Sequence, residues 1–492
     1  MVRVSGFASG MDIDDIVSKM MQAQRVPLDK MVQKKQYSEW QRDDYRSLNS
    51  AMLEFDRFIF DGIGMESSFA KKIVNVSNPN ALSIKGVNAT SNFSGTITVK
   101  ELASSSTLIG DTAINSATKK LSDYGIATGE NIIKAINEKG EMQEYKFQIT
   151  ADDTMDSVIN KINSQTGVTA FFDGTGKLSF TSKQTGNVSG KGIEFVSGDF
   201  VNKVFTNVTS TVGGNAQVTY NGVDIERTSN VFTINGAEFT LKEKTTGPIT
   251  FSSTTDVDAI LDTVTQFVNK YNELIEKISD KTTEAKYRSF TPLTAEQKKA
   301  MSEDEIKMWE EKAKSGTLRS DPTLKSLLST MRTSLYTSVS GATGIKNLSE
   351  LGITTTKNYL EGGKLTIDEK KLKEAISKDP SAIYKLFMTK GEPVDPAKPA
   401  GPFKKETQGL AYRLRSDLDL AMKSITEKAG KAGYVNDKFS IGKSLNDLDK
   451  RISAFEVKLT RLENRYYSQF TAMEKAIQKA NSQSASLMQY FG

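Results

Sequence analysis

The stretch IGKSLNDLDKRISAFEVKLTRLENRYYSQFTAMEKAI, residues 441–477, carries a long regular apolar pattern. Its large apolar side chains recur at steps of three and four, with one irregular step near Tyr466: Ile441, Leu445, Leu448, Ile452, Phe455, Leu459, Leu462, Tyr466, Phe470, Met473 and Ile477. This heptad spacing predicts a helix of ~55 Å at about 1.5 Å per residue. A core helix of a globular domain is the alternative, but the length favours a coiled coil.

The N-terminal region offers a partner for this helix. Ile13, Ile16, Val17, Met20 and Met21 form an apolar face, which is interrupted at Arg25-Val-Pro27. A second apolar run follows with Tyr45, Leu48, Met52, Phe55 and Ile59. Methionine-rich faces repack easily and suit adaptable contacts, although ordinary core methionines are equally compatible with the pattern.

The middle of the chain differs from both ends in charge and pattern. Residues 76–250 contain 15 Lys/Arg and 17 Asp/Glu, whereas the rest of the chain contains 50 and 43. Asn221-Gly222 and Asn235-Gly236 each separate two short alternating segments, which predicts two hairpins with type I′ turns. A third hairpin is expected around Asp173-Gly-Thr-Gly176. We therefore expect a β-rich insertion between helical ends, interrupted by one helix that begins near Met155 and ends at Gly167.

Two segments interrupt the helical pattern that starts at Val257. Residues 290–316 are rich in charge and read as a solvated helical excursion. Pro393, Pro396, Pro399 and Pro402 recur every three residues, which is polyproline II spacing. A stiff surface loop over 391–402 is favoured over a ligand for a proline-binding domain.

The composition excludes many kinds of active site. The chain has no cysteine and no histidine, so thiol nucleophiles, disulfides, histidine bases and the usual zinc sites are absent. Gly442-Lys-Ser444 lacks the glycine of a phosphate-binding loop, and Asp152, Asp153 and Asp156 do not fit a calcium loop. The net charge of +5 and the absence of a long apolar run favour neither nucleic acid nor a membrane as partner. We expect no catalysis, cofactor or metal.

Several motifs resemble one family. Ser5-Gly-Phe-Ala-Ser-Gly10-Met-Asp-Ile-Asp14-Asp-Ile-Val17 resembles the N-terminal signature of flagellar filament cap proteins, the hook-associated protein 2 family. Residues 156–170 resemble the IN motif of flagellins and hook-associated proteins, with Val158, Ile159, Ile162, Gly167 and Val168 at its apolar and glycine positions. Phe267-Val-Asn-Lys-Tyr271-Asn-Glu-Leu-Ile275 and the C-terminal heptads are also similar to the family. The resemblance covers essentially the whole chain.

The resemblance implies an α+β multidomain architecture. Its expected parts are coiled-coil legs from residues 1–44 and 441–492, a mainly helical domain from 45–75 and 254–440, a β-rich plate domain from 76–105 and 214–253, and an outermost α+β domain from 106–213. The expected contacts between the legs, and between the legs and the filament, are made by Ile13, Ile16, Met20, Leu448, Ile452, Phe455, Leu459, Leu462 and Tyr466.

The resemblance also implies a function without catalysis. Several copies would cap the distal tip of the bacterial flagellar filament and guide exported flagellin into place. The implied partners are further copies of the chain, flagellin, other hook-associated proteins, the flagellar type III export apparatus and an export chaperone; an extracellular location follows from that export route.

Two other functions are compatible with the sequence. The β-rich region could bind mucin or glycans as a surface adhesin, or the chain could be another hook-associated axial protein. An Asp/Glu-based glycan hydrolase is a third option, but no pair of carboxylates stands in a recognisable frame. The sequence does not specify the number of subunits, the flagellin served, or the roles of 290–316 and 391–402.

Overall fold

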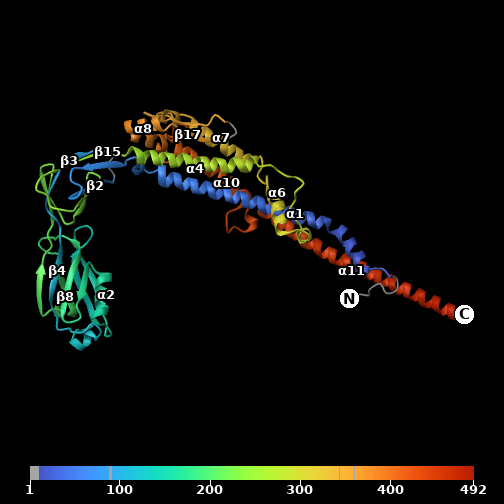
Figure 1. Cartoon of the computed structure of the whole chain (residues 1–492), viewed down its shortest axis with the longest axis horizontal. Helices are drawn as coiled ribbons and strands as arrows, with labels where there is room; N and C mark the ends of the chain where they lie inside the picture. The colour runs from blue at the N-terminus through green and yellow to red at the C-terminus, as the bar shows by residue number, and fades with distance from the viewer. Residues whose placement is uncertain (1–9, 88–90, 343, 359–360, 492) are drawn as a thin grey trace. The chain divides into compact units, whose positions relative to one another are not determined.

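A computed structural model describes residues 10–87, 91–342, 344–358 and 361–491, and the chain divides into two compact units (Figure 1). The helical unit comprises Met1–Met65 and Leu261–Gly492, and the β-rich unit comprises Glu66–Ile260. The expected α+β class, with helices from both ends of the chain and strands inserted between them, is confirmed. Residues 5–9 of the N-terminal signature lie outside the described part of the chain.

The helical unit is built around long helices that pack along one another. The helices are α1 (Ile13–Phe58), α4 (Val257–Thr283), α5 (Ala295–Lys299), α6 (Glu303–Lys314), α7 (Pro322–Tyr336), α8 (Glu369–Lys378), α9 (Pro380–Met388), α10 (Leu410–Ala429) and α11 (Ser440–Phe491), and β16 (Ile353–Thr355) pairs with β17 (Leu365–Ile367). Part of its core is aromatic. The ring of Phe267 lies 6.0 Å from that of Phe55 and 5.2 Å from that of Phe387, which joins α4 to α1 and α9.

Helix α1 is continuous through Pro27, where we expected the apolar face to break. A proline inside a helix removes one backbone hydrogen bond and costs about 3 kcal/mol. Val17 and Leu28 are both buried, so the apolar face resumes directly after the proline and packing holds the two halves in one helix. The expected boundary after residue 44 also falls inside α1, so it does not separate two structural elements.

The β-rich unit contains four sheets and two hydrophobic cores. Its strands are β1 (Lys72–Val76), β2 (Leu82–Gly86), β3 (Ser94–Glu101), β4 (Ser105–Asp111), β5 (Gly129–Ile136), β6 (Met142–Ile149), β7 (Val168–Phe172), β8 (Lys177–Thr185), β9 (Ile193–Ser197), β10 (Asn207–Thr211), β11 (Ala216–Tyr220), β12 (Val223–Arg227), β13 (Val231–Ile234), β14 (Ala237–Leu241) and β15 (Ile249–Thr255); its helices are α2 (Met155–Gln165) and α3 (Asp199–Lys203).

One core of this unit lies between a five-stranded sheet, ordered β1-β15-β3-β11-β12, and a three-stranded sheet, β13-β14-β2. The other core gathers α2 and α3 with the sheets β10-β4-β8-β7 and β6-β5-β9. The insertion therefore has two separate cores among its described residues.

The expected hairpins form at the glycine-containing turns. Asn221 and Gly222 have φ of 47° and 86°, and Asn235 and Gly236 have φ of 50° and 77°. Positive φ at both central residues is what a type I′ turn requires. These turns join β11 to β12 and β13 to β14, and β7 pairs with β8 across the third expected hairpin.

Three expected boundaries of the β-rich region are displaced by a few residues. Strand β1 already begins at Lys72, β4 begins at Ser105, and β15 continues to Thr255. Strand β1 lies at the edge of its sheet and alternates between half-buried and exposed residues. An edge strand of this kind has a weak apolar pattern, and the run of Ser and Thr in β15 has a weaker one still.

The proline-containing loop is a turn-rich hairpin. The backbone N–H of Val394 donates to Pro402 O at 2.8 Å, and that of Lys404 donates to Glu392 O at 2.8 Å. A turn follows at Asp395, whose carbonyl accepts from Lys398 N. These bonds between its two sides replace the extended polyproline II conformation that the spacing suggested, and the loop remains on the surface.

Candidate functional site

The candidate site is the pair formed by α1 and α11, the two helices that come from opposite ends of the chain. Figure 1 shows them side by side, α1 in blue and α11 in red. The Tyr467 hydroxyl donates to Asp14 Oδ1 at 2.8 Å, and Lys35 Nζ lies 2.5 Å from Asp449 Oδ1. Because the early residue of α1 meets the later residue of α11, the two helices run antiparallel.

Most of the residues expected at this contact are buried or half-buried. On α11, Leu448 and Leu459 are buried, at 3% and 8% exposure, and the remaining expected positions are half-buried: Ile452, Phe455, Leu462 and Tyr466. On α1, Ile13 is buried and Ile16 is half-buried. A seam made largely of half-buried side chains has less apolar area removed from water than a protein core.

Met20 is the most exposed of the three residues expected on α1, because its side chain is 37% exposed. Val17 is 1% exposed and Leu28 is 5% exposed, and these two residues occupy the buried positions instead. The sequence contains a signal for the burial of Val17, because Val17 follows Ile13 by four residues and therefore lies on the same helix face. Leu28 was missed because it follows Pro27, where we expected the face to end.

Polar contacts also fix the middle of α1. The Asp449 carboxylate accepts a hydrogen bond from Lys35 and raises the pKa of that lysine. Further along, the Tyr45 hydroxyl donates to Asp321 Oδ2 at 2.6 Å, and burial together with this bond raises the pKa of Tyr45. Asp321 also caps the start of α7, so α1 is tied to the rest of the helical unit through a buried group.

Helix α11 extends well past the start of α1. Tyr467 lies level with Asp14, near the first turn of α1, and α11 continues from there to Phe491. These last 24 residues amount to about 36 Å of helix at ~1.5 Å per residue. Leu487 and Met488 lie near the end of this extension and are 58% and 75% exposed. The extension offers apolar side chains that α1 does not cover.

The IN motif residues lie in a core and not on a surface. Val158, Ile162 and Val168 are fully buried, and Ile159 packs against the same cluster. Helix α2 does not end at a left-handed glycine as expected, because Gly167 has no positive φ. A Cβ on Gly167 would lie 2.6 Å from the Tyr145 ring, so this glycine is required for close packing.

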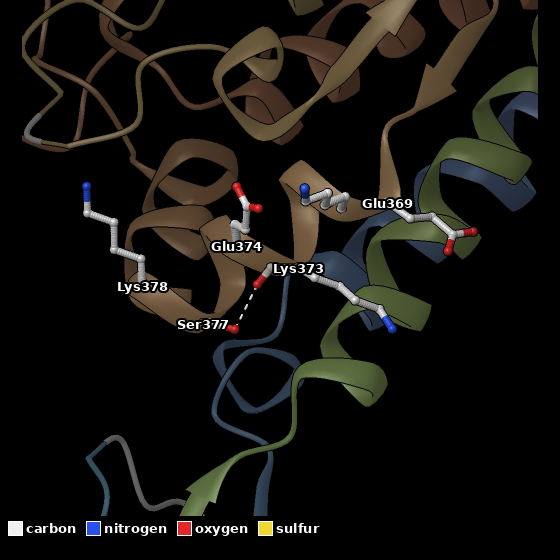
Figure 2. A pocket seen from close by; sticks show the side chains of 6 residues that line it. Glu369, Lys373, Glu374, Ser377 and Lys378 are labelled. Carbon is white, nitrogen blue, oxygen red and sulfur yellow. Dashed lines mark hydrogen bonds between the residues drawn. The ribbon is translucent and has the colours of Figure 1, made fainter.

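The hollow on α8 does not gather an arrangement suited to chemistry. Figure 2 shows an open hollow on α8 lined by Glu369, Lys373, Glu374, Ser377 and Lys378, whose charged ends point in different directions. The Ser377 hydroxyl donates to the Lys373 carbonyl at 2.8 Å, within the helix itself. Across the described ranges no group of three acidic side chains could hold a metal ion. No helix there is both long and apolar enough for a bilayer span.

Models of known protein families match the chain along most of its length. The model for the C-terminus of flagellar hook-associated protein 2 matches residues 213–482, which is more than half of the chain, and the model for its N-terminus matches residues 9–106. The model for the flagellin hook IN motif matches residues 133–184.

Curated relatives and solved structures agree with these matches. The flagellar hook-associated protein 2 of Halalkalibacterium halodurans is 32% identical over 100% of both chains, and that of Escherichia coli strain K12 is 26% identical over 99% of this chain and 97% of the relative. The solved D1-D2-D3 domains of the Escherichia coli flagellar cap protein FliD superpose with a TM-score of 0.56 at 22% identity, covering 78% of this chain and 99% of that one. That structure supports the fold.

Proposed function

Because the chain belongs to the flagellar hook-associated protein 2 family, the filament cap proteins also named FliD, we propose that the pair of α1 and α11 is the part of this cap protein that contacts the flagellin filament. The observation that carries the proposal is the antiparallel pairing of helices from both ends of the chain. Such a pair is stiff along its length and leaves one long face of each helix available to a partner.

The seam of this pair suits a cap that must release and rebind as the filament grows. A cap that guides flagellin and then moves has to bind the filament tip at each step and still dissociate quickly enough for the next step. Half-buried contacts permit repacking at a moderate cost in free energy, whereas a large rigid apolar interface would dissociate slowly. Met20 at 37% and Val457 at 52% exposure are outward-facing apolar residues of the pair, and we assign them to contact with the filament.

The remaining partners follow from the same proposal. Several copies of the chain form the cap, next to flagellin and the other hook-associated proteins, and each copy reaches the tip through the flagellar type III export apparatus with an export chaperone. A chain without cysteine is compatible with passage in an unfolded state, because no disulfide has to be made or broken. The comparisons do not support the adhesin alternative.

Deletion of the gene tests the cap function. A strain without the chain should release flagellin monomers into the medium and show no filaments by electron microscopy, and a plasmid copy should restore them. Normal filaments in the deletion strain would refute the proposal. Light scattering and electron micrographs of the purified protein would give the number of subunits.

A matched pair of substitutions on α11 tests the role of the helix pair. Leu459→Asp places a charge at a residue that is 8% exposed and should cost about 3 kcal/mol or more of helix pairing, whereas Val457→Asp changes a residue that is 52% exposed. Leu459→Asp should abolish swimming while the β-rich unit stays folded by circular dichroism. Val457→Asp should keep the helix pair folded. Normal motility of the Leu459→Asp strain would show that the cap does not need the α1–α11 pair to function.

A further inference from the structure

The segment 290–316 is docked onto α1 and is not a free excursion. Gln33 Nε2 donates to Thr291 Oγ1 at 3.2 Å, and Trp309 Nε1 donates to the Thr291 carbonyl at 2.8 Å. The rings of Phe290 and Trp309 lie 4.6 Å apart. Helix α6 is therefore held at a defined place beside α1, as Figure 1 shows.

The docked segment and α1 enclose a pocket that we call the basic pocket. Its cationic lining residues are Lys30, Lys34, Lys286 and Arg288, and its aromatic ones include Tyr37, Tyr287 and Phe290. None of the residues that line it is acidic. Within the described part of the chain, no ion pair joins Lys30, Lys34 or Arg288 to a carboxylate. Four cations around one hollow create a positive potential that favours an acidic partner.

Helix α6 presents an acidic face on the side away from this pocket. Trp309 and Ala313 point inward, with Ala313 lining the basic pocket. Asp304, Lys307, Met308 and Glu311 follow the i, i+3, i+4, i+7 spacing of one helix face, so they share the opposite, exposed face of the helix, where the two carboxylates outnumber the single lysine. Met308 is 59% exposed. The two carboxylates and the exposed methionine on this face complement the cations and the aromatic rings that line the basic pocket.

We propose that the acidic face of α6 docks into the basic pocket of a second copy of this chain. Asp304 and Glu311 pair with lysine and arginine side chains of that copy, and Met308 packs against its aromatic residues. The face cannot fill the pocket of its own chain, because the two lie on opposite sides of α6. This inference rests on the proposed cap function, since it requires several copies at the filament tip.

The geometry of this contact suits a closed ring. The contact is heterologous: each copy offers the acidic face to one neighbour and the basic pocket to the other, and heterologous contacts generate rings when the rotation closes. The acidic face lies on α6, and the basic pocket lies between α1 and residues just before and after α6, so both surfaces lie beside the same part of α1. Neighbouring copies aligned side by side at that level bring the two surfaces together.

The absence of cysteine makes a direct cross-linking test possible, since introduced thiols are the only ones in the chain. Lys34→Cys and Met308→Cys variants, both at exposed positions, are co-expressed in a strain without the native gene, and isolated filaments are treated with a short bis-maleimide. A cross-linked dimer that requires both variants is expected. A single chain that carries both substitutions should give a ladder of products that ends at the size of the cap.

Controls separate this contact from chance collisions. Met308→Cys combined with Leu420→Cys, which is 64% exposed on α10, should give no dimer. Each single variant alone should also give none. Filaments that grow normally without a dimer between Lys34→Cys and Met308→Cys would overturn the inference but leave the cap function intact. Failure of the wild-type gene to restore filaments would instead refute the cap function.

A charge exchange gives an independent measurement. Lys34→Glu with Arg288→Glu should lower the number of filaments per cell by about tenfold, because like charges then face each other across the contact. Adding Asp304→Lys and Glu311→Lys to the same chain reverses both surfaces and should restore filament number. A fourfold variant that performs no better than the double variant would contradict the inference, and so would a double variant with normal filaments.

Discussion

Arg413 is a buried cation in the helical unit, with 2% of its surface exposed. Its guanidinium donates hydrogen bonds to five backbone carbonyls: Lys405 at 2.9 Å, Ser334 at 3.3 Å, Thr337 at 2.7 Å, Ser338 at 3.2 Å and Glu406 at 2.8 Å. The carbonyls of Ser334, Thr337 and Ser338 belong to the end of α7 and the residues after it, where helix carbonyls lack partners. The arginine therefore ties this helix end to the segment before α10.

Arg413→Lys should destabilise the helical unit by about 2–4 kcal/mol, because lysine has three donors without the planar fork and leaves buried carbonyls unpaired. Urea unfolding followed by the fluorescence of Trp40 and Trp309 measures this change. Arg415→Lys is the matched control on the same helix; Arg415 is half-exposed and pairs with Asp56, so about 1 kcal/mol or less is expected. Equal effects of the two substitutions would contradict the role of the carbonyl cluster.

Asp153 is a buried carboxylate beside the start of α2. Burial alone would raise its pKa, but hydrogen bonds from Lys161, Ser157 and Thr150 outweigh that effect and lower the pKa of Asp153 to about 2. The unfolded value is about 3.9. Since the folded pKa lies below the unfolded one, the carboxylate stabilises the fold above pH ~4, and this contribution is lost as the pH falls from ~4 to ~2.

Asp153→Asn should lower the free energy of unfolding of the β-rich unit by about 2 kcal/mol at pH 7. The difference from the wild type should shrink steadily as the pH falls from about 4 to 2, which calorimetry at several pH values can follow. Asp152→Asn is the matched control, since the neighbouring side chain is 86% exposed and should matter little at any pH. A difference that does not depend on pH would show that charge is not the cause.

For single residues, the sequence predicted burial well where it follows the helical period, and poorly where it depends on a distant packing partner. The heptad spacing selected Leu448 and Leu459, and both are buried, because burial on a helix follows its period. It selected Met20 in place of Val17, since both are apolar and only the packed partner distinguishes them. Arg413 lies in a helix rich in charge and resembles a surface residue, because the carbonyls that surround it come from distant parts of the chain.

At the scale of elements, Pro27 in α1 shows how tertiary packing overrides local preference. The proline lacks the N–H that would bond to the carbonyl of Ala23, yet the helix runs from Ile13 to Phe58. The sequence offered the proline as a break because local propensity disfavours it there. The contact with α11, which supplies the compensating free energy, involves residues more than 400 positions away. Hairpins closed by Asn-Gly turns were predictable for the opposite reason, since everything they need is local.

Pro27→Ala should raise the stability of the α1–α11 pair by about 1–3 kcal/mol, because the helix regains a hydrogen bond and loses a steric conflict. Hydrogen exchange of the α1 amides measured by mass spectrometry should slow around residue 27. Val26→Ala, at a residue that is 47% exposed, provides the control and should leave exchange unchanged. Faster exchange in Pro27→Ala would mean that the proline ring itself packs favourably.

At the scale of the whole molecule, the division into a helical and a β-rich unit was predictable because composition changes along the chain. Charge density, glycine content and the change of period from helix to strand all mark the insertion. The sheet order was not predictable. Strands β1 and β15 lie at opposite ends of the insertion, and β3 pairs with both β11 and β15. Such pairings depend on loop closure over more than a hundred residues, which leaves no local signal.

The pairing of β1 with β15 predicts that the β-rich unit folds without the helical unit. Lys72 is the partner of Thr255 in the antiparallel register, so the two points where the chain enters and leaves the unit are adjacent in one sheet. Both hydrophobic cores of the unit are made of residues from within the unit itself. A fragment of residues 66–260 should therefore unfold cooperatively, with a Tm within about 5 °C of the corresponding transition in the full chain, when followed by calorimetry and circular dichroism. Fragment 78–247, which lacks both β1 and β15, should be clearly less stable. A fragment 66–260 without a cooperative transition would mean that the helical unit is needed to hold these strands together.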